Sequence, residues 1–287
     1  MSRHRFLKRN KRIRLKEKRI MIRAVSIAVL LFSLLGFVVW GAHNQSVRIT
    51  DIYVEGNSAV PNKNIKELVL SNINDKYLWL FPKNNILIYP RGRIKQDILA
   101  VFKRIYYIKI NVIDLTSIVI TIKERDPFAL WCGENPVNVK SATSNLCFFI
   151  DNTGFVFSRA PNFSDNVYFT VYGALQETSF GQNILDVSIG KRFLEKEYFE
   201  SIMLFRDALS NEGVSTDYLI FQDNNDIELY ITTGGKIVFN KKQDIEKIFR
   251  DLISAIGAKE VAGTNIWGSL EYIDLRFDNK VLFKFLR

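Results

Sequence analysis

An uncharged apolar run near the N-terminus constrains the fold of this chain more than any other feature. Residues 24–40 carry no charge, and the run grows to about 20 residues when residues 20–22 and 41–42 are included. A helix of that length matches the hydrocarbon core of a bilayer. We therefore expect a transmembrane helix at residues 24–42. A cleavable signal peptide is the alternative, but Val39-Trp40-Gly41 is a poor cleavage site and the apolar run is long.

Charge is distributed unevenly around this run. Residues 1–23 hold eleven Lys or Arg and one acidic residue, Glu17, while the rest of the chain has equal numbers of basic and acidic residues. Basic segments stay on the cytoplasmic side, so residues 1–23 are predicted to be a cytoplasmic tail and the chain beyond residue 43 extracytoplasmic. We expect the tail to contact anionic lipid. A nucleic-acid arm is the weaker alternative, because aromatic and glycine residues do not regularly interleave the charges.

Residues 47–124 predict a small domain of three strands and two helices. A strand at 47–57 ends in a Gly-Asn turn, and apolar residues at helical spacing then predict two helices, after Pro61 and after Pro90. Strands at 105–114 and 117–123 follow, which gives the order β-α-α-β-β and a core between the helices and one sheet face. The buried stripes are expected to contain Ile65, Leu68 and Val69 in the first helix and Ile94, Ile98, Val101 and Phe102 in the second.

Residues 125–287 predict a mixed β domain with two helices, so the fold class is α+β. Strands are expected at 128–131, 147–150, 155–158, 218–221, 226–232, 236–240, 272–277 and 281–286. One helix is predicted from about Lys191 to Leu209, stopping at the 211–213 segment. The other is predicted to begin at Asn240, capped by its side chain with Gln243 reaching back, and to end at Gly257.

Candidate chemistry is sparse. The only histidines are His4 and His43, which excludes a Ser-His-Asp triad or a histidine metal site in the outer domains. Gly234-Gly235-Lys236 lies between two strands and is better explained as a hairpin turn than as a phosphate loop. Glu124 and Asp126 are the one suggestive carboxylate pair. We expect no enzyme, no cofactor, no nucleic-acid partner and no small-molecule substrate.

Two cysteines and the last strand are the remaining candidates. Cys132 and Cys147 flank a polar loop between two predicted strands, and a disulfide there is plausible in an oxidising compartment, with unpaired thiols as the alternative. The strand at 281–286 carries Phe283 and Phe285 and is expected to lie at a sheet edge. It is predicted either to bind a partner by strand addition or to pair internally with residues 226–240.

These features together resemble the FtsQ/DivIB family of bacterial division proteins, which carry a POTRA domain and a β domain. The resemblance covers nearly the whole chain. It rests on the order and spacing of Val54-Glu-Gly-Asn57, the 122–129 segment Ile-Lys-Glu-Arg-Asp-Pro-Phe-Ala, the 149–157 hairpin, Tyr172-Gly173 and the 273–277 segment Ile-Asp-Leu-Arg-Phe.

The resemblance implies a non-enzymatic divisome scaffold. It would be a single-pass protein of the cytoplasmic (inner) membrane at the division septum, with a POTRA domain at 47–124 and a β domain at 125–287. Its partners would be FtsB/DivIC-like and FtsL-like coiled-coil proteins. The implied partner-binding residues are Arg276, Phe277, Lys280, Val281, Phe283 and Phe285, with Phe277 standing where the family commonly has Tyr. The alternatives are a POTRA protein of envelope secretion or assembly, and a membrane-anchored cell-wall enzyme.

Overall fold

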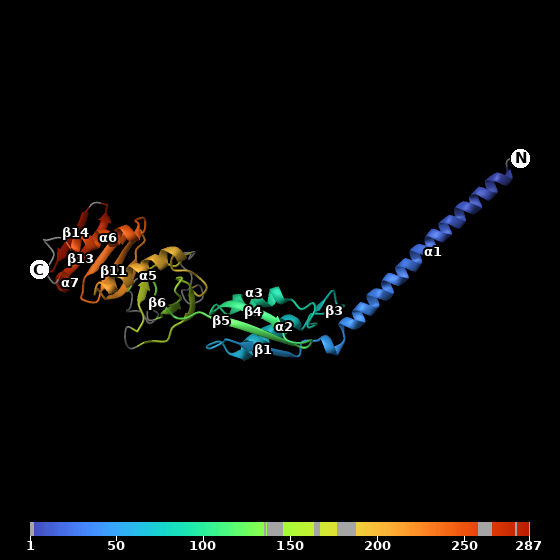
Figure 1. Ribbon diagram of the computed structural model, residues 1–287, viewed down its shortest axis with the longest axis horizontal. Coiled ribbons are helices and arrows are strands. Elements are labelled where there is room, and N and C mark those ends of the chain that lie inside the picture. Colours follow the sequence, from blue (N-terminus) through green and yellow to red (C-terminus); the bar gives the residue numbers. More distant parts are fainter. Residues whose placement is uncertain are drawn as a thin grey trace. The chain divides into compact units, whose positions relative to one another are not determined.

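The chain divides into two compact units, Met1–Glu124 and Arg125–Arg287, so that the division falls within the charged triplet 124–126. The computed structural model describes residues 3–134, 136, 146–163, 167–176, 188–257, 266–278 and 280–286, with side chains from residue 18 onward. Helices and strands are both abundant, which confirms the predicted α+β class (Figure 1).

The first unit opens with one long helix, α1 (Arg3–Ala42). Its part from Lys18 to Ala42 is long and apolar enough to cross a membrane, and contains the predicted 24–42 span. The basic segment before it, predicted only as a tail, belongs to the same helix. The short η1 helix (Gln45–Val47) follows and is capped by Asn44, whose side chain accepts from the Ser46 N–H at 3.1 Å.

The first sheet has the strand order β1-β5-β4, from β1 (Asp51–Glu55), β4 (Ile105–Val112) and β5 (Ser117–Glu124). β1 is parallel to β5, and β4 is antiparallel to it. Helices α2 (Asn62–Ile73) and α3 (Arg91–Val101) share an apolar core with the sheet. The core is rich in Ile because a β-branched residue every second position fills one face of a pleated strand. Its fully buried members include Ile65, Val69, Ile94, Ile98, Ile110, Ile118 and Ile120.

Two details of this unit differ from the prediction. A hairpin of β2 (Lys76–Tyr77) and β3 (Phe81–Pro82) occupies the predicted loop between the two helices. Val101, predicted to be buried, is exposed. It is the last residue of α3, and the chain leaves helical geometry at Phe102, which packs against the core in its place.

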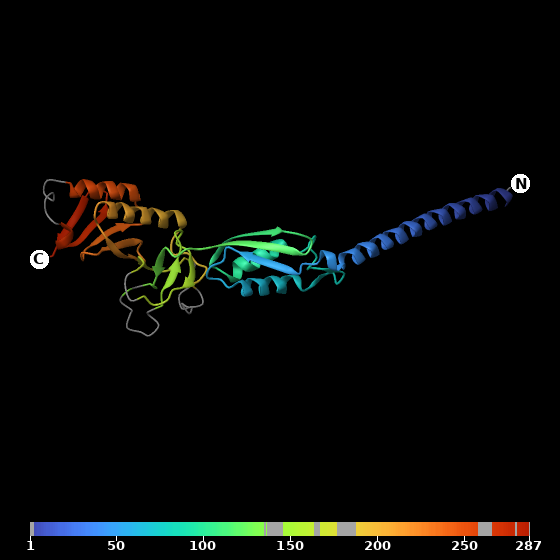
Figure 2. The ribbon, with the colours of Figure 1, turned by 60° about the horizontal axis from the view of Figure 1, so that its bottom comes forward.

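The second unit is built on a nine-stranded sheet with the order β14-β13-β12-β11-β10-β9-β6-β7-β8. Helices α5 (Lys196–Asn211) and α6 (Ile245–Ile256) pack against one sheet face and contact each other through Phe205 and Phe249, whose ring centroids lie 6.0 Å apart (Figure 2). The strands are β6 (Ala129–Trp131), β7 (Phe148–Ile150), β8 (Val156–Arg159), β9 (Thr170–Tyr172), β10 (Thr216–Phe221), β11 (Asp226–Ile231), β12 (Lys236–Asn240), β13 (Leu270–Phe277) and β14 (Lys280–Phe285), and the short helix α7 (Ile266–Ser269) precedes β13.

Helices α5 and α6 of the second unit both begin later than predicted. Helix α5 begins at Lys196 instead of about Lys191, because residues 188–191 form a turn that bonds to Val156, and Arg192 bridges to Phe155. Helix α6 begins at Ile245, and its cap is Asp244, whose carboxylate accepts from the Glu246 N–H at 2.9 Å. Asn240 ends β12 instead of capping the helix. The expected contact with Gln243 exists, at 2.9 Å, but it closes the turn between β12 and α6.

Candidate functional site

The two edge strands of the nine-stranded sheet, β8 and β14, have different surroundings. At the β8 edge, the Val156 N–H donates to the Lys191 carbonyl at 2.9 Å, and the Gly190 N–H donates to the Val156 carbonyl at 2.8 Å. Phe155 and Arg192 form an additional bridge. Backbone from outside the sheet therefore covers the start of this edge, at Phe155 and Val156, and such covering is a common way to prevent pairing with another chain.

The opposite edge is formed by β14. This strand pairs antiparallel with β13, for example Ile273 with Phe283, and the Leu286 N–H extends the pairing to the Ser269 carbonyl at 2.7 Å. In the described parts of the chain, no strand pairs with its outer side. The alternative that residues 281–286 pair with residues 226–240 is therefore wrong. β13 takes that position, as its parallel register with β12 shows.

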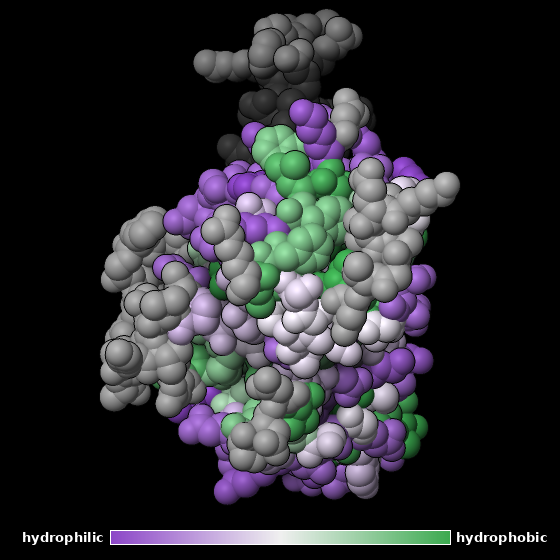
Figure 3. Space-filling model, turned by 90° about the vertical axis from the view of Figure 1, so that its left-hand side faces the viewer, coloured by the Kyte–Doolittle hydropathy of each residue, from purple (hydrophilic) through white to green (hydrophobic). Residues whose placement is uncertain are grey.

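Apolar side chains alternate along β14. Val281 and Phe283 pack against the core, and the ring of Phe285 stacks on that of Phe283 with centroids 6.2 Å apart. Phe285 remains 40% exposed and Phe277, at the end of β13, is 50% exposed. Figure 3 views this end of the molecule and shows apolar side chains gathered among polar ones. An edge with unpaired backbone and exposed apolar side chains can accept an additional strand.

Arg276 is fixed by ion pairs within its own unit. Its guanidinium donates to Asp274 at 2.6 Å and to Asp226 at 2.8 Å, and both carboxylates are nearly buried. Burial alone would raise the pKa of Asp274, but the Arg276 side chain and backbone N–H lower it below its usual value. Asp226 also accepts from Asn240 at 2.7 Å. The network joins β11, β12 and β13, so Arg276 positions the strand that supports the open edge.

The lysines of β14 differ in their surroundings. Lys284 pairs with Glu271 at 2.7 Å and lies over the Tyr272 ring, 5.6 Å from its centroid, so it ties β14 to β13. Lys280 is exposed and faces Phe277 in the strand register. The six residues that the resemblance implied therefore lie together on β13 and β14. Sequence reasoning missed Leu282 and Leu286, which are exposed on the same edge and which the alternation of the strand could have indicated.

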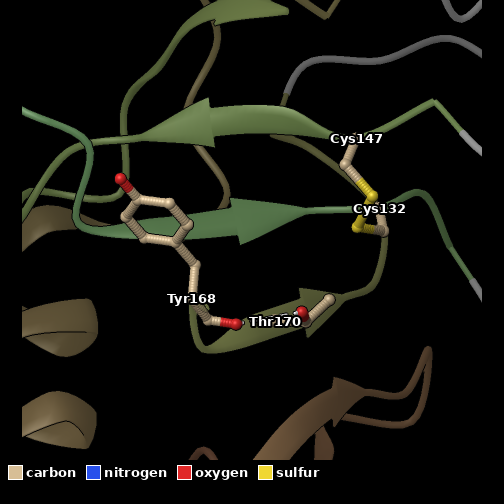
Figure 4. The surroundings of a disulfide bond; sticks show 4 residues. All are labelled: Cys132, Cys147, Tyr168 and Thr170. Atoms are coloured by element: carbon tan, nitrogen blue, oxygen red, sulfur yellow. Dashed lines mark hydrogen bonds between the residues drawn. A yellow bond between two sulfur atoms is a disulfide. The ribbon is translucent and has the colours of Figure 1, made fainter. Parts of the chain in front are cut away.

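Cys132 and Cys147 form a disulfide, with Cα atoms 4.2 Å apart (Figure 4). The bond joins the end of β6 to the start of β7, at the far side of the sheet from β14. Backbone bonds hold both ends, since the Cys132 N–H donates to Val171 at 3.2 Å and the Cys147 carbonyl accepts from Ala160 at 2.9 Å. The bond therefore closes a long loop on a paired part of the sheet.

Glu124, the first residue of the charged triplet, binds backbone amides. Its carboxylate accepts from the N–H groups of Ser58, Ala59 and Val60 at 2.8 to 3.0 Å and pairs with Arg104 at 3.0 Å. Burial would raise the pKa of Glu124, but these four donors lower it below its usual value. The loop that donates these N–H groups follows Gly56, whose φ of +80° favours glycine.

The other two residues of the triplet have different surroundings. Arg125 pairs with Asp151 and lies over the Phe155 ring, 4.1 Å from its centroid. Asp126 is exposed. The Glu124–Asp126 acid pair considered above is therefore unsupported, because Glu124 is engaged by amides and an arginine. Across the residues that the structure describes, no group of three His, Cys, Asp or Glu side chains could hold a metal ion.

Comparison with known proteins adds no identification. The sequence matches no protein-family model and no curated protein.

Proposed function

We propose that this chain is a single-pass, non-enzymatic scaffold of the FtsQ/DivIB kind, which binds other division proteins by strand addition at β14. The observation that carries the proposal is the difference between the two sheet edges. The β8 edge is covered at its start by residues 190–192, while β14 presents a paired inner side and, as far as the described residues show, an open outer side. A protein that covers one edge and leaves the other open has a surface suited to a partner strand.

The rest of the architecture supports the same proposal. The β1-β5-β4 sheet with α2 and α3 has the β-α-α-β-β order of a POTRA domain, once the small β2–β3 hairpin is set aside. The apolar part of α1 follows a strongly basic segment, which favours a cytoplasmic N-terminus and extracytoplasmic units. Location in the cytoplasmic membrane at the septum belongs to the proposal and follows from the resemblance.

Binding at β14 requires only non-covalent contacts. A partner strand would pair its backbone with the outer side of β14, and Leu282, Phe285 and Phe277 would supply apolar contacts. The partner proposed from the resemblance is an FtsB/DivIC-like coiled-coil protein, itself associated with an FtsL-like one. Main-chain pairing would give affinity and the exposed apolar side chains would give specificity.

The test is Phe285→Asp in the full-length chain. A carboxylate at the open edge should abolish capture of the FtsB/DivIC-like protein in a pull-down from detergent-solubilised membranes, because it would be desolvated without a partner. Leu204→Asp is the matched control, since Leu204 is an exposed apolar residue of α5 in the same unit. That variant should bind as the wild type does. Thermal unfolding of both variants shows whether the fold is retained.

Equal binding by a folded Phe285→Asp variant would reject the strand-addition site. Release or joining of peptidoglycan fragments by the purified full-length chain would reject the scaffold and favour the membrane-anchored cell-wall enzyme. Retained binding to a secretion or assembly component, with none to a division protein, would favour the other alternative.

A further inference from the structure

The β2–β3 hairpin ends in an exposed apolar tip. Leu78 and Trp79 form its turn and are 83% and 92% exposed, and Leu80 beside them is also exposed. Lys76 and Tyr77 pair with Pro82 and Phe81 to form the hairpin stem. Clustered large apolar side chains on an otherwise polar surface usually mark contact with a protein or a membrane.

The backbone at this tip adopts a conformation that its residues disfavour. The φ angles of Leu78 and Trp79 are +47° and +59°, in the left-handed region where turns normally place Gly, Asn or Asp. The Leu80 N–H closes the turn by donating to the Tyr77 carbonyl at 3.0 Å. Bulky residues held in such a conformation are often retained for the use of their side chains.

Hydrogen bonds connect this region to the end of α1. The buried Asn85 donates through its side-chain nitrogen to the carbonyl of Ala42, the last residue of α1, at 3.0 Å. The side-chain oxygen of the same Asn85 accepts from the Leu87 N–H at 2.9 Å. Leu87 is 77% exposed. Asn85 therefore bonds both to the end of α1 and to the backbone of Leu87, whose large apolar side chain is exposed.

Backbone hydrogen bonds join the segment that follows the β2–β3 hairpin to the segment that follows α1. The Ile86 N–H donates to Val47 at 2.9 Å, and the Ile49 N–H donates to Asn84 at 2.8 Å. β3 also contacts α1, and Figure 1 shows the hairpin beside that end of the helix. The seven residues from Trp79 to Asn85 span at most about 20 Å. If Ala42 lies at a membrane surface, the tip is within reach of that surface.

We propose that residues 78–80 insert into the outer interface of the bilayer that α1 spans, with Trp79 as the anchor. The indole ring has an apolar body and a polar N–H, which favours the boundary between headgroups and acyl chains. The inference rests on the part of the proposed function that makes α1 a membrane span, and it does not depend on strand addition at β14. The lipid contact gives the first unit a second attachment to the membrane surface.

The experiment uses the full-length chain reconstituted into phosphatidylcholine vesicles. Trp79 fluorescence is obtained as the difference between the wild type and Trp79→Phe, and Trp40 fluorescence as the difference between the wild type and Trp40→Phe. The quenchers are lipids with bromines at shallow or deep acyl positions and aqueous iodide. We expect Trp79 to be quenched by shallow bromines more than by deep ones and to be protected from iodide.

Three results would overturn the inference, and they can be told apart. If lipid bromines quench Trp40 but iodide quenches Trp79, α1 spans the bilayer and the hairpin tip lies in water. If lipid bromines quench neither residue, the membrane span itself is wrong. A Trp79 signal that loses its iodide sensitivity only after a protein partner is added would also overturn the inference, because the tip would then be a protein-binding site.

Discussion

Glu124 and Arg125 are adjacent in the chain, yet each serves a different unit. Glu124 accepts three backbone N–H groups from the loop after β1 and pairs with Arg104. Arg125 pairs with Asp151 in the hairpin between β7 and β8. Glu124 is the last residue of β5 and Arg125 is the first residue of the second unit, so each charge bonds within its own unit. The triplet thus completes two separate structures.

Replacing Glu124 by Gln should destabilise the first unit by about 2 kcal/mol near neutral pH, since hydrogen bonds to a charged group are being weakened. Because the folded pKa is lowered, this stabilisation is present above the ordinary value of 4.5 and is lost as the pH falls through the folded pKa. Urea unfolding at pH 7 and in acid measures the loss of stability and its dependence on pH. Glu55→Gln, at the exposed end of β1, is the control and should change stability little; an equal effect of both substitutions would contradict the assignment.

At the scale of elements, the residue at which each helix begins depends on the contacts of the segment that precedes it. Residues 190–192 are held against β8, so α5 cannot begin until Lys196. Asn240 is held in β12 by pairing with Asp226, so α6 is capped by Asp244 instead. The open β14 edge is defined in the same way, by the absence of such a covering segment among the described residues.

The cap of α6 gives a prediction at this scale. Asp244→Ala should reduce the stability of the second unit by about 1 kcal/mol, because the N–H of Glu246 loses its acceptor. Asp244→Asn should be nearly neutral, because Asn is an equally good cap. Chemical denaturation of the two variants tests this. A similar loss in both would show that the charge of Asp244 matters more than its capping hydrogen bond.

At the scale of the whole molecule, each unit has its own apolar core. One apolar cluster consists of residues of the first unit, and two consist of residues from Phe128 onward. Separate cores favour separate cooperative unfolding. The disulfide belongs entirely to the second unit.

Calorimetry of the full-length chain in detergent should therefore show two unfolding transitions. Reducing the Cys132–Cys147 bond should lower only the unfolding temperature of the second unit, because that unit loses about 3 kcal/mol of unfolding free energy in the loop-entropy model. Glu124→Gln should lower only the unfolding temperature of the first unit. A single transition that shifts in response to both changes would indicate one cooperative unit.

Much of this organisation could be predicted from local sequence patterns. The span at 24–42, the alternating Ile118, Ile120 and Ile122 of β5, and the turn at residues 151–154 all depend on residues near one another in the chain. An uncharged run of membrane length, a period of two and a turn signal act over a few residues, so the sequence alone specifies them. The same holds for placing Val281, Phe283 and Phe285 on a final strand.

Long-range backbone pairing was decided only by the tertiary structure. Residue periodicity indicates that β8 and β14 are strands, but not that residues 190–192 cover one of them while the other keeps an open side. It also does not show that Asn85 would bond to Ala42 and so join the segment after the β2–β3 hairpin to the end of α1. These contacts join residues that are distant in sequence, and their geometry depends on how the whole sheet and its loops pack. The sequence by itself therefore determined an apolar helix long enough to cross a membrane and most of the other elements, while the packed fold decided which sheet edge stays open among the described residues.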